Sequence, residues 1–223
     1  MASFGGKIVV GGSRIADGKR VGFLQRYSGD AIGDHTYEYK PGADVDIRRA
    51  RRVANGYHLI GSQGGKGLLI SQRSDLKKVE RLLIDTEDGY LNDVSAPPGY
   101  ALMVVGKVKS SAGVGTAHAF RLSNTTVLNR KKPGPSNGDA ELIAIDAGLK
   151  SSMAVGWQQA SSGQNKQAWI YVLSPTFSVQ QDKVLNLGFK SSEALAVRAV
   201  GDGTVVLGAR PRSTRKSRRS SPA

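Results

Sequence analysis

Leu102-Met103-Val104-Val105-Gly106 decides the fold, because it is one of several short apolar runs that close on a glycine. The equivalent runs are Ile8–Gly11, His58–Gly61, Ser152–Gly156 and Val205–Gly208. Their glycines recur at intervals of about 50 residues, and a fixed period in this range is typical of repeat proteins. We therefore expect a repeated structural unit, and such a scaffold favours binding over catalysis.

Three other short runs accompany each glycine-terminated strand and complete the unit. A run rich in aromatic and β-branched residues, which suit strands, follows it at Val21–Tyr27, Gly67–Arg73, Ala117–Ser123 and Ala168–Ser174. A fourth strand is expected at His35–Tyr39, Val79–Ile84, Thr125–Leu128 and Lys183–Phe189. A first strand, called here the lead strand, is expected before the later glycines at Val45–Ala50, Tyr90–Val94, Glu141–Ile145 and Ala194–Ala199.

Four short antiparallel strands per unit make up one blade of a β-propeller. The order of lead strand, Asn-Gly or Asp-Gly turn, Tyr-x-apolar-x-Gly strand and third strand resembles loosely conserved bacterial β-propeller repeats over residues 7–208. The resemblance implies an all-β fold, a small or incomplete β-propeller of four to five four-stranded blades, with residues 1–209 as its repeat domain. A β-sandwich is the alternative fold, and the four-strand period argues against it.

The strand count does not close evenly. The chain begins on a glycine-terminated strand, and a fifth such strand at Val205–Gly208 has no third or fourth strand after it. The fold therefore has an extra strand, or the chain is a piece of a larger propeller, or a partner completes it. Because exposed sheet edges promote association, we expect a protein partner or self-association that completes the propeller.

The net charge of +14 over 223 residues is large. Residues 210–223 hold six basic groups and no acid, and we expect them to form a disordered basic tail. These groups are Arg210, Arg212, Arg215, Lys216, Arg218 and Arg219. The tail could neutralise nucleic-acid phosphates, act as a localisation signal or bind acidic partners. The alternative is a solubilising tail or the remnant of a linker.

A second basic segment lies on a predicted lead strand. It contains Arg48, Arg49, Arg51 and Arg52. Alternation places Arg49 and Arg51 on one side of the strand and the other two on the opposite side. The functional interpretation is an anion-binding site at a channel mouth. We favour instead a set of salt bridges between blades, with Asp44 and Asp46 as nearby acidic partners, because four arginines are not buried without partners.

A third basic segment is the predicted loop at residues 129–138, which includes Arg130, Lys131 and Lys132. A long loop on a rigid scaffold often carries recognition, and a tolerated surface insertion is the slightly favoured alternative. These residues, the arginine run and the tail are the candidate sites for nucleic acid or another anion.

The sequence contains no motif for catalysis or for a cofactor. It has no cysteine, and its three histidines lack metal-binding spacing. P-loop, dinucleotide and Gly-x-Ser-x-Gly motifs are absent, and nothing selects a catalytic pair of carboxylates. Trp157, Trp169, Tyr171 and Tyr27 could stack on sugars or bases, but core packing is the favoured role. We therefore expect no cofactor, no bound metal and no membrane association.

The leading functional hypothesis is a non-catalytic interaction module that binds a protein partner through propeller loops or incomplete blade edges. An accessory nucleic-acid-binding protein that uses the tail and the arginine strand is the second hypothesis. A lectin-like or glycoside-acting propeller is the third, so an enzymatic role is left open and disfavoured. The sequence as written suggests the cytoplasm, or secretion if a natural signal precedes it.

Overall fold

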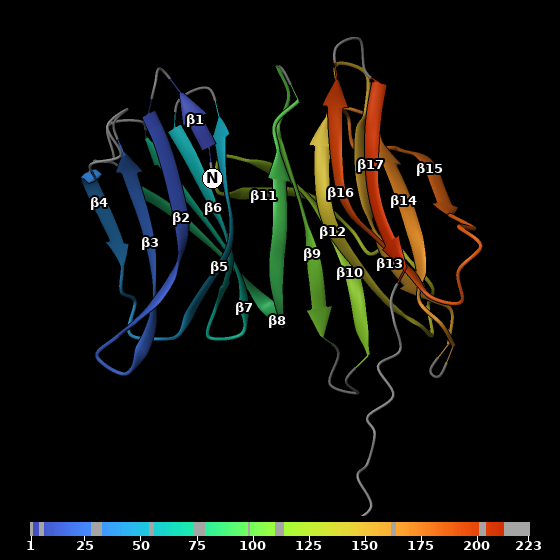
Figure 1. Cartoon of the computed structure of the whole chain (residues 1–223), viewed down its shortest axis with the longest axis horizontal. Coiled ribbons are helices and arrows are strands. Elements are labelled where there is room, and N and C mark those ends of the chain that lie inside the picture. The colour runs from blue at the N-terminus through green and yellow to red at the C-terminus, as the bar shows by residue number, and fades with distance from the viewer. Residues whose placement is uncertain are drawn as a thin grey trace, which may run out of the picture.

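The computed structural model describes residues 2–4, 7–27, 33–53, 56–73, 79–97, 99–109, 114–161, 164–200 and 204–211. Within these ranges the regular structure is antiparallel β-strand, which confirms the predicted all-β class (Figure 1). In the same ranges there is no helix long and apolar enough to cross a membrane. The predicted tail lies outside the described residues from residue 212 onward.

The strands form four sheets in chain order. The first contains β1 (Ala2–Phe4), β2 (Lys7–Ala16), β3 (Lys19–Tyr27) and β4 (Gly33–Tyr39). The second contains β5 (Val45–Val53), β6 (Gly56–Gln63), β7 (Lys66–Arg73), β8 (Val79–Ser95), β9 (Leu102–Lys109), β10 (Gly115–Ser123) and β11 (Thr126–Lys131). The third contains β12 (Asp139–Ala147), β13 (Ser152–Gln159), β14 (Gln167–Leu173) and β15 (Val179–Val184), and the last pairs β16 (Ser192–Val200) with β17 (Thr204–Pro211).

The second sheet contains two of the predicted units, because one long strand belongs to both. Residues 79–84 of β8 pair with β7, and residues 89–95 pair with β9. The sequence predicted two separate strands here, and the structure joins them without a break. Unit 1 is thus β1–β4, unit 2 is β5–β7 with the start of β8, unit 3 is the end of β8 with β9–β11, unit 4 is β12–β15 and unit 5 is β16–β17.

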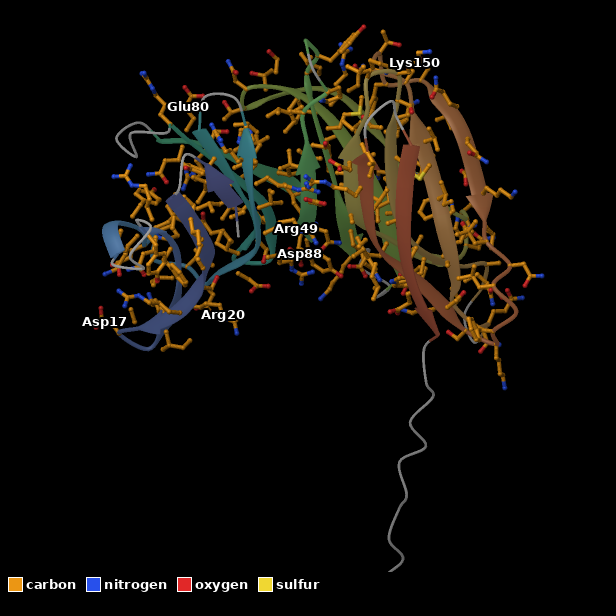
Figure 2. The ribbon with its side chains drawn as sticks, turned by 45° about the horizontal axis from the view of Figure 1, so that its top comes forward. Asp17, Arg20, Arg49, Glu80, Asp88 and Lys150 are labelled. Carbon is orange, nitrogen blue, oxygen red and sulfur yellow. The ribbon has the colours of Figure 1, made fainter. Side chains whose placement is uncertain are left out.

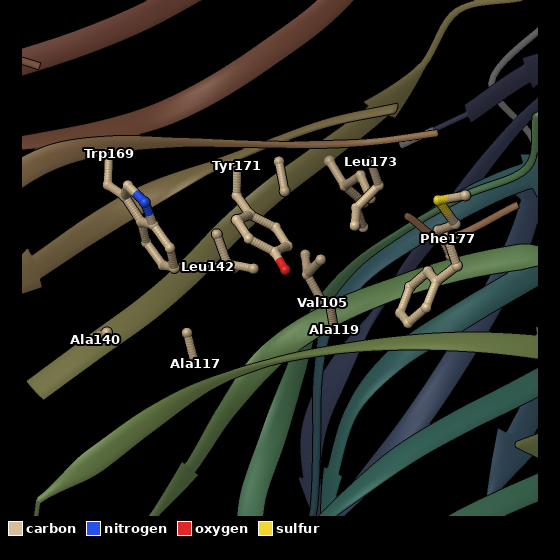
Figure 3. Close-up of a cluster of buried hydrophobic side chains, with 12 residues drawn as sticks. Val105, Ala117, Ala119, Ala140, Leu142, Trp169, Tyr171, Leu173 and Phe177 are labelled. Atoms are coloured by element: carbon tan, nitrogen blue, oxygen red, sulfur yellow. The ribbon is translucent and has the colours of Figure 1, made fainter. Parts of the chain in front are cut away.

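Each pair of consecutive units encloses a hydrophobic core. In β6, Leu59 packs in the core between units 1 and 2, whereas its neighbour Ile60 packs in the core between units 2 and 3. Successive side chains of a strand point to opposite faces, so a sheet that is buried on both faces has continuous apolar runs. This explains why the glycine-terminated strands are apolar throughout. Figure 3 shows the core between units 3 and 4, with Trp169, Tyr171 and Leu142 among its members.

Three of the recurring glycines lie opposite β-bulges in the lead strands. Gly61, Gly106 and Gly156 pair with Ile47, Leu91 and Leu142, and the residue after each of these is bulged out. A Cβ at these glycines would lie 1.7, 2.1 and 1.9 Å from the carbonyl oxygens of Asp46, Tyr90 and Glu141, respectively. Any side chain there would clash with the lead strand, so the bulge explains the glycine. The strands themselves continue past the glycines, rather than ending there as predicted.

Two predicted strand assignments are wrong. The chain does not begin on a glycine-terminated strand, because Ala2–Phe4 form β1 and pair with β2. The fourth strand of unit 4 is Val179–Val184 instead of Lys183–Phe189, because a tight turn at Ser174–Ser178 starts it early. Leu185 and Leu187, which suggested a strand by their alternation, pack against the core between units 4 and 5.

Among the described residues, no strand ladder connects the first sheet to the last, and the two lie on opposite sides of the molecule in Figure 1. In the described part of the chain, unit 5 consists of its lead strand and its glycine-bearing strand, so β17 has one hydrogen-bonded neighbour strand there, β16. β17 also includes Arg210 and Pro211, so it extends two residues into the segment predicted as tail.

Candidate binding site at the ends of the lead strands

A cavity of about 1260 Å³ opens where the carboxyl ends of four lead strands come together. Its walls include Arg51–Val53 from β5, Val94–Ser95 from β8, Asp146–Ala147 from β12 and Arg198–Ala199 from β16. A smaller cavity of about 500 Å³ lies at the amino ends of β5 and the second part of β8. Figure 2 labels Glu80 from the first cavity, and Arg20 and Asp88, at the opposite end of the molecule, from the second. We call the larger one the lead-strand cavity.

Arg51, which lines the lead-strand cavity, is held by the buried carboxylate of Asp93 on β8. Asp93 accepts hydrogen bonds from Arg49 Nη1 at 2.9 Å and from Arg51 Nε and Nη2 at 3.0 and 2.9 Å. The backbone N–H groups of Val94 and Ile145 donate to it at 2.9 and 3.1 Å. A buried charge is stable only when paired and hydrogen-bonded, and here both conditions are met. Units 2, 3 and 4 are thus joined at one carboxylate.

A second carboxylate, Asp146 on β12, extends this network to unit 5. It accepts a 2.9 Å hydrogen bond from the Ala199 N–H, and Ser95 Oγ donates to it at 3.4 Å. Arg51 Nη1 and Arg198 Nε lie 3.7 and 3.8 Å from it. In units 2 to 4 the lead-strand bulge follows the residue that pairs with the glycine. Residues at the same distance from the bulge are therefore equivalent positions in the three lead strands. Arg51, Ser95 and Asp146 are such equivalent positions.

Burial shifts two titratable groups near the cavity. Burial lowers the pKa of His58 to about 4, and Ser71 Oγ lies 2.9 Å from its Nδ1. Burial by itself would lower the pKa of Arg51, but the hydrogen bond and charge of Asp93, together with Asp146, raise it above its ordinary value. His58 is therefore neutral at pH 7 and Arg51 is a permanent cation.

The predicted arginine run is divided between the two ends of the molecule. Arg51 and Arg52 line the lead-strand cavity, and Arg49 pairs with Asp93. Arg48 lines the smaller cavity, where it donates to Asn92 Oδ1 at 2.9 Å and stacks 3.6 Å from the centre of the Tyr90 ring. Bridging between units is thus observed for Arg48, Arg49 and Arg51. Of the two acidic partners suggested by sequence, Asp46 contacts Arg48 at 3.3 Å.

The other predicted basic residues that the structure describes are not among the residues that line the lead-strand cavity. Arg130 and Lys131 belong to β11, so part of the predicted loop is a strand, and Lys132 follows it. Arg130 lies 5.7 Å from the Phe120 ring and Lys131 lies 5.7 Å from the Phe177 ring. Arg210 lies on β17. The remaining predicted tail residues, Arg212, Arg215, Lys216, Arg218 and Arg219, lie outside the described residues.

Sequence reasoning missed most of the cavity. Asp146 could have been found by aligning the units on their glycines, because Arg51 and Asp146 lie equally far before Gly61 and Gly156. Asp93 could not, because it lies one residue further from Gly106 than Arg49 lies from Gly61, and only the strand register makes these two positions equivalent. Arg73, Arg198 and Tyr100 also line the cavity, and they come from the ends of β7 and β16 and from the loop before β9. No sequence signal brings these three together.

Trp157, Trp169 and Tyr171 are buried, which confirms their predicted role in the core, whereas Tyr27 is half-buried. Trp169 Nε1 donates to Asp182 Oδ1 at 2.7 Å. In the part of the chain that the structure describes, histidine and acidic side chains do not gather into a metal-binding group.

No protein-family model matches this sequence, and a search of curated proteins finds no match.

Proposed function

We propose that this protein is a small or incomplete β-propeller that acts as a non-catalytic interaction module and binds a protein partner. The supporting observation is the edge of β17. Each of the preceding units has four strands, and there the equivalents of β17 (β2, β6, β9 and β13) have a strand on both sides. In the described chain, β17 is paired on one side only.

An unpaired strand edge presents a row of backbone donors and acceptors to which another strand can add. A two-stranded sheet is also marginally stable in water, so an added strand would stabilise unit 5. The added strand takes the place that β7 has beside β6 in unit 2. An extended segment of a partner protein fits this place.

Two proline substitutions in β17 test the proposal as a matched pair. The N–H groups of Val205 and Val206 point to opposite sides of the strand, as in any β-strand. One of Val205→Pro and Val206→Pro therefore removes a hydrogen bond to β16, and the other removes only an outward donor. We call the variant that loses only the outward donor the outward variant. Circular dichroism and thermal unfolding identify it as the one of the two that keeps wild-type stability.

Binding is measured in two ways. The first uses a fluorescent peptide that reproduces Lys66–Arg73, the third strand of unit 2. The second uses mass spectrometry to identify the proteins from the source cells that the immobilised protein retains. We expect the outward proline variant to lose the peptide and the partner that the wild type retains. Equal retention by the wild type and the outward variant would reject the edge as the binding site. A wild-type dimer in light scattering that the outward proline abolishes would identify a second copy as the partner.

A further inference from the structure

We infer that the lead-strand cavity binds an extended acidic peptide segment that carries apolar side chains. This site is separate from the β17 edge. The inference rests on the proposed function only in that the ligand is a segment of a protein. The inference is carried by the juxtaposition of arginines and exposed apolar groups in one open cavity.

The cavity is cationic. In the described chain its walls contain four arginines and two carboxylates: Arg51, Arg52, Arg73, Arg198, Glu80 and Asp146. Asp146 is already engaged by Ala199, Ser95 and the nearby guanidinium groups. The excess of arginine favours an anionic ligand by charge complementarity.

Arg198 is the most exposed member of this network. Its side chain is 73% exposed, and its Nε lies 3.8 Å from Asp146, beyond hydrogen-bond distance. Arg73, which lines the cavity from unit 2, is also exposed. A guanidinium group offers a planar pair of donors that matches a carboxylate. These two arginines are therefore placed to bind acidic side chains of a ligand that crosses the cavity.

Exposed apolar groups also line the cavity. Tyr100 and Leu128 are 48% and 46% exposed, and both line the cavity. Peptide ligands typically combine an apolar anchor with a few charged contacts. The volume of about 1260 Å³ exceeds the usual range of small-molecule sites, roughly 300–1,000 Å³. A polymer segment therefore fits the cavity better than a small metabolite.

The two carboxylates disfavour a nucleic acid in the same place. A nucleic-acid strand has a negative charge at every phosphate, so it would meet Glu80 and Asp146 as well as the arginines. A peptide can place its acidic residues opposite the arginines alone. Single strands also need aromatic platforms for their bases, and Tyr100 is the one exposed aromatic among the described lining residues.

The test measures fluorescence anisotropy with a labelled peptide in which Glu alternates with Leu. A peptide with Gln in place of Glu and a thymidine oligonucleotide are the comparison ligands. We expect the acidic peptide to bind more tightly than both. The double variant Arg73→Ala/Arg198→Ala should weaken its binding about tenfold, whereas Lys183→Ala/Lys190→Ala, which removes equal charge outside the cavity, should change it less than twofold.

A charge reversal gives the sharper result. Arg198→Glu should lose the acidic peptide and gain affinity for a peptide in which Lys alternates with Leu, and circular dichroism checks that the variant is folded at the temperature of the binding assay. Equal effects of the cavity and control variants, or tighter binding of the oligonucleotide, would overturn the inference. The outward proline variant of β17 keeps this cavity, so it should retain the acidic peptide even if the strand-edge proposal fails.

Discussion

At the residue scale, the structure depends on the hydrogen bonds and ion pairs of its buried polar groups. Asp93 is fully buried, and its five hydrogen bonds from described residues come from units 2, 3 and 4. Removing one member of such a set leaves the others charged and unpaired, which costs more than the set contributes when intact. The arginine run is therefore a structural element that connects consecutive units.

Replacing Asp93 should destabilise the protein strongly. We expect Asp93→Ala to lower the free energy of unfolding by about 3–5 kcal/mol, because Arg49 and the half-buried Arg51 both lose the carboxylate that they share. Asp46→Ala is the control, because its carboxylate is 38% exposed and its arginine contacts are long, at 3.3 and 3.4 Å. That change should cost less than about 1 kcal/mol. Urea denaturation at pH 7 measures both values, and similar losses would contradict this account of the network.

His58 should make the stability depend on pH. Its pKa is lowered from an ordinary 6.5 to about 4 by burial, so between these values the unfolded chain binds a proton that the folded chain does not. The stabilising contribution is complete above pH 6.5 and is lost as the pH falls towards 4, by about 3 kcal/mol in total.

Denaturation curves at pH 7.5, 6.0 and 5.0 measure this effect, and His58→Asn supplies the control. The variant lacks the imidazole, so its stability should change less between these pH values. An identical slope in the wild type and the variant would assign the pH dependence to other groups.

At the element scale, the lead-strand bulge explains the repeated glycine. The bulge brings a lead-strand carbonyl against the paired strand in units 2, 3 and 4, and only a residue without a side chain fits there. In unit 5 the bulge falls one residue earlier relative to the glycine, so Gly208 pairs with Ala196 and has more room. The same sequence feature therefore has different physical causes in different units.

This difference predicts opposite outcomes for two alanine substitutions. Gly106→Ala places a Cβ 2.1 Å from the Tyr90 carbonyl oxygen and should cost about 1–3 kcal/mol or more. Gly208→Ala places its Cβ 3.4 Å from the Ala196 Cβ, and it should be neutral or stabilise the protein by up to about 1 kcal/mol. Thermal unfolding compares the two, and an equal cost would show that the bulge is not the reason for Gly106.

At the scale of the whole molecule, consecutive sheets pack face to face, and polar layers connect the carboxyl ends of their lead strands. The lead-strand cavity results from this arrangement and belongs to no single unit. Arg130 and Lys131, at the end of β11, are not among the residues that line it. Different variants can therefore test binding at the cavity and general attraction of polyanions separately.

Removing the tail should reduce non-specific binding of nucleic acid without changing the fold. Ending the chain after Pro211 preserves β17 and removes five basic residues. The slope of log affinity for duplex DNA against log salt should then become smaller by up to about 4. A tail of equal length made of Gly and Ser is the control and should behave like the truncated protein. An unchanged slope would assign nucleic-acid binding to the folded domain.

The all-β class, the repeated unit and the position of most strands could be predicted from the sequence, because apolar periodicity and turn residues act locally along the chain. The continuity of β8 could not, because pairing with both β7 and β9 makes its two halves one strand. The early start of β15 follows from the tight turn at Ser174–Ser178, and the alternation of Leu185 and Leu187 reflects packing against the core between units 4 and 5 instead of a strand.

The charge of the arginine run and its strand conformation were readable in the sequence, but its partners were not. Asp93 lies more than 40 residues further along the chain, and Asp146 more than 90, so their contacts exist only once the lead strands lie side by side. The same holds for Arg73, Tyr100 and Arg198, which come from three units and share one cavity. Strand formation follows from the local sequence pattern. The site follows from the packing of one unit against the next, because this packing brings residues from distant parts of the chain together.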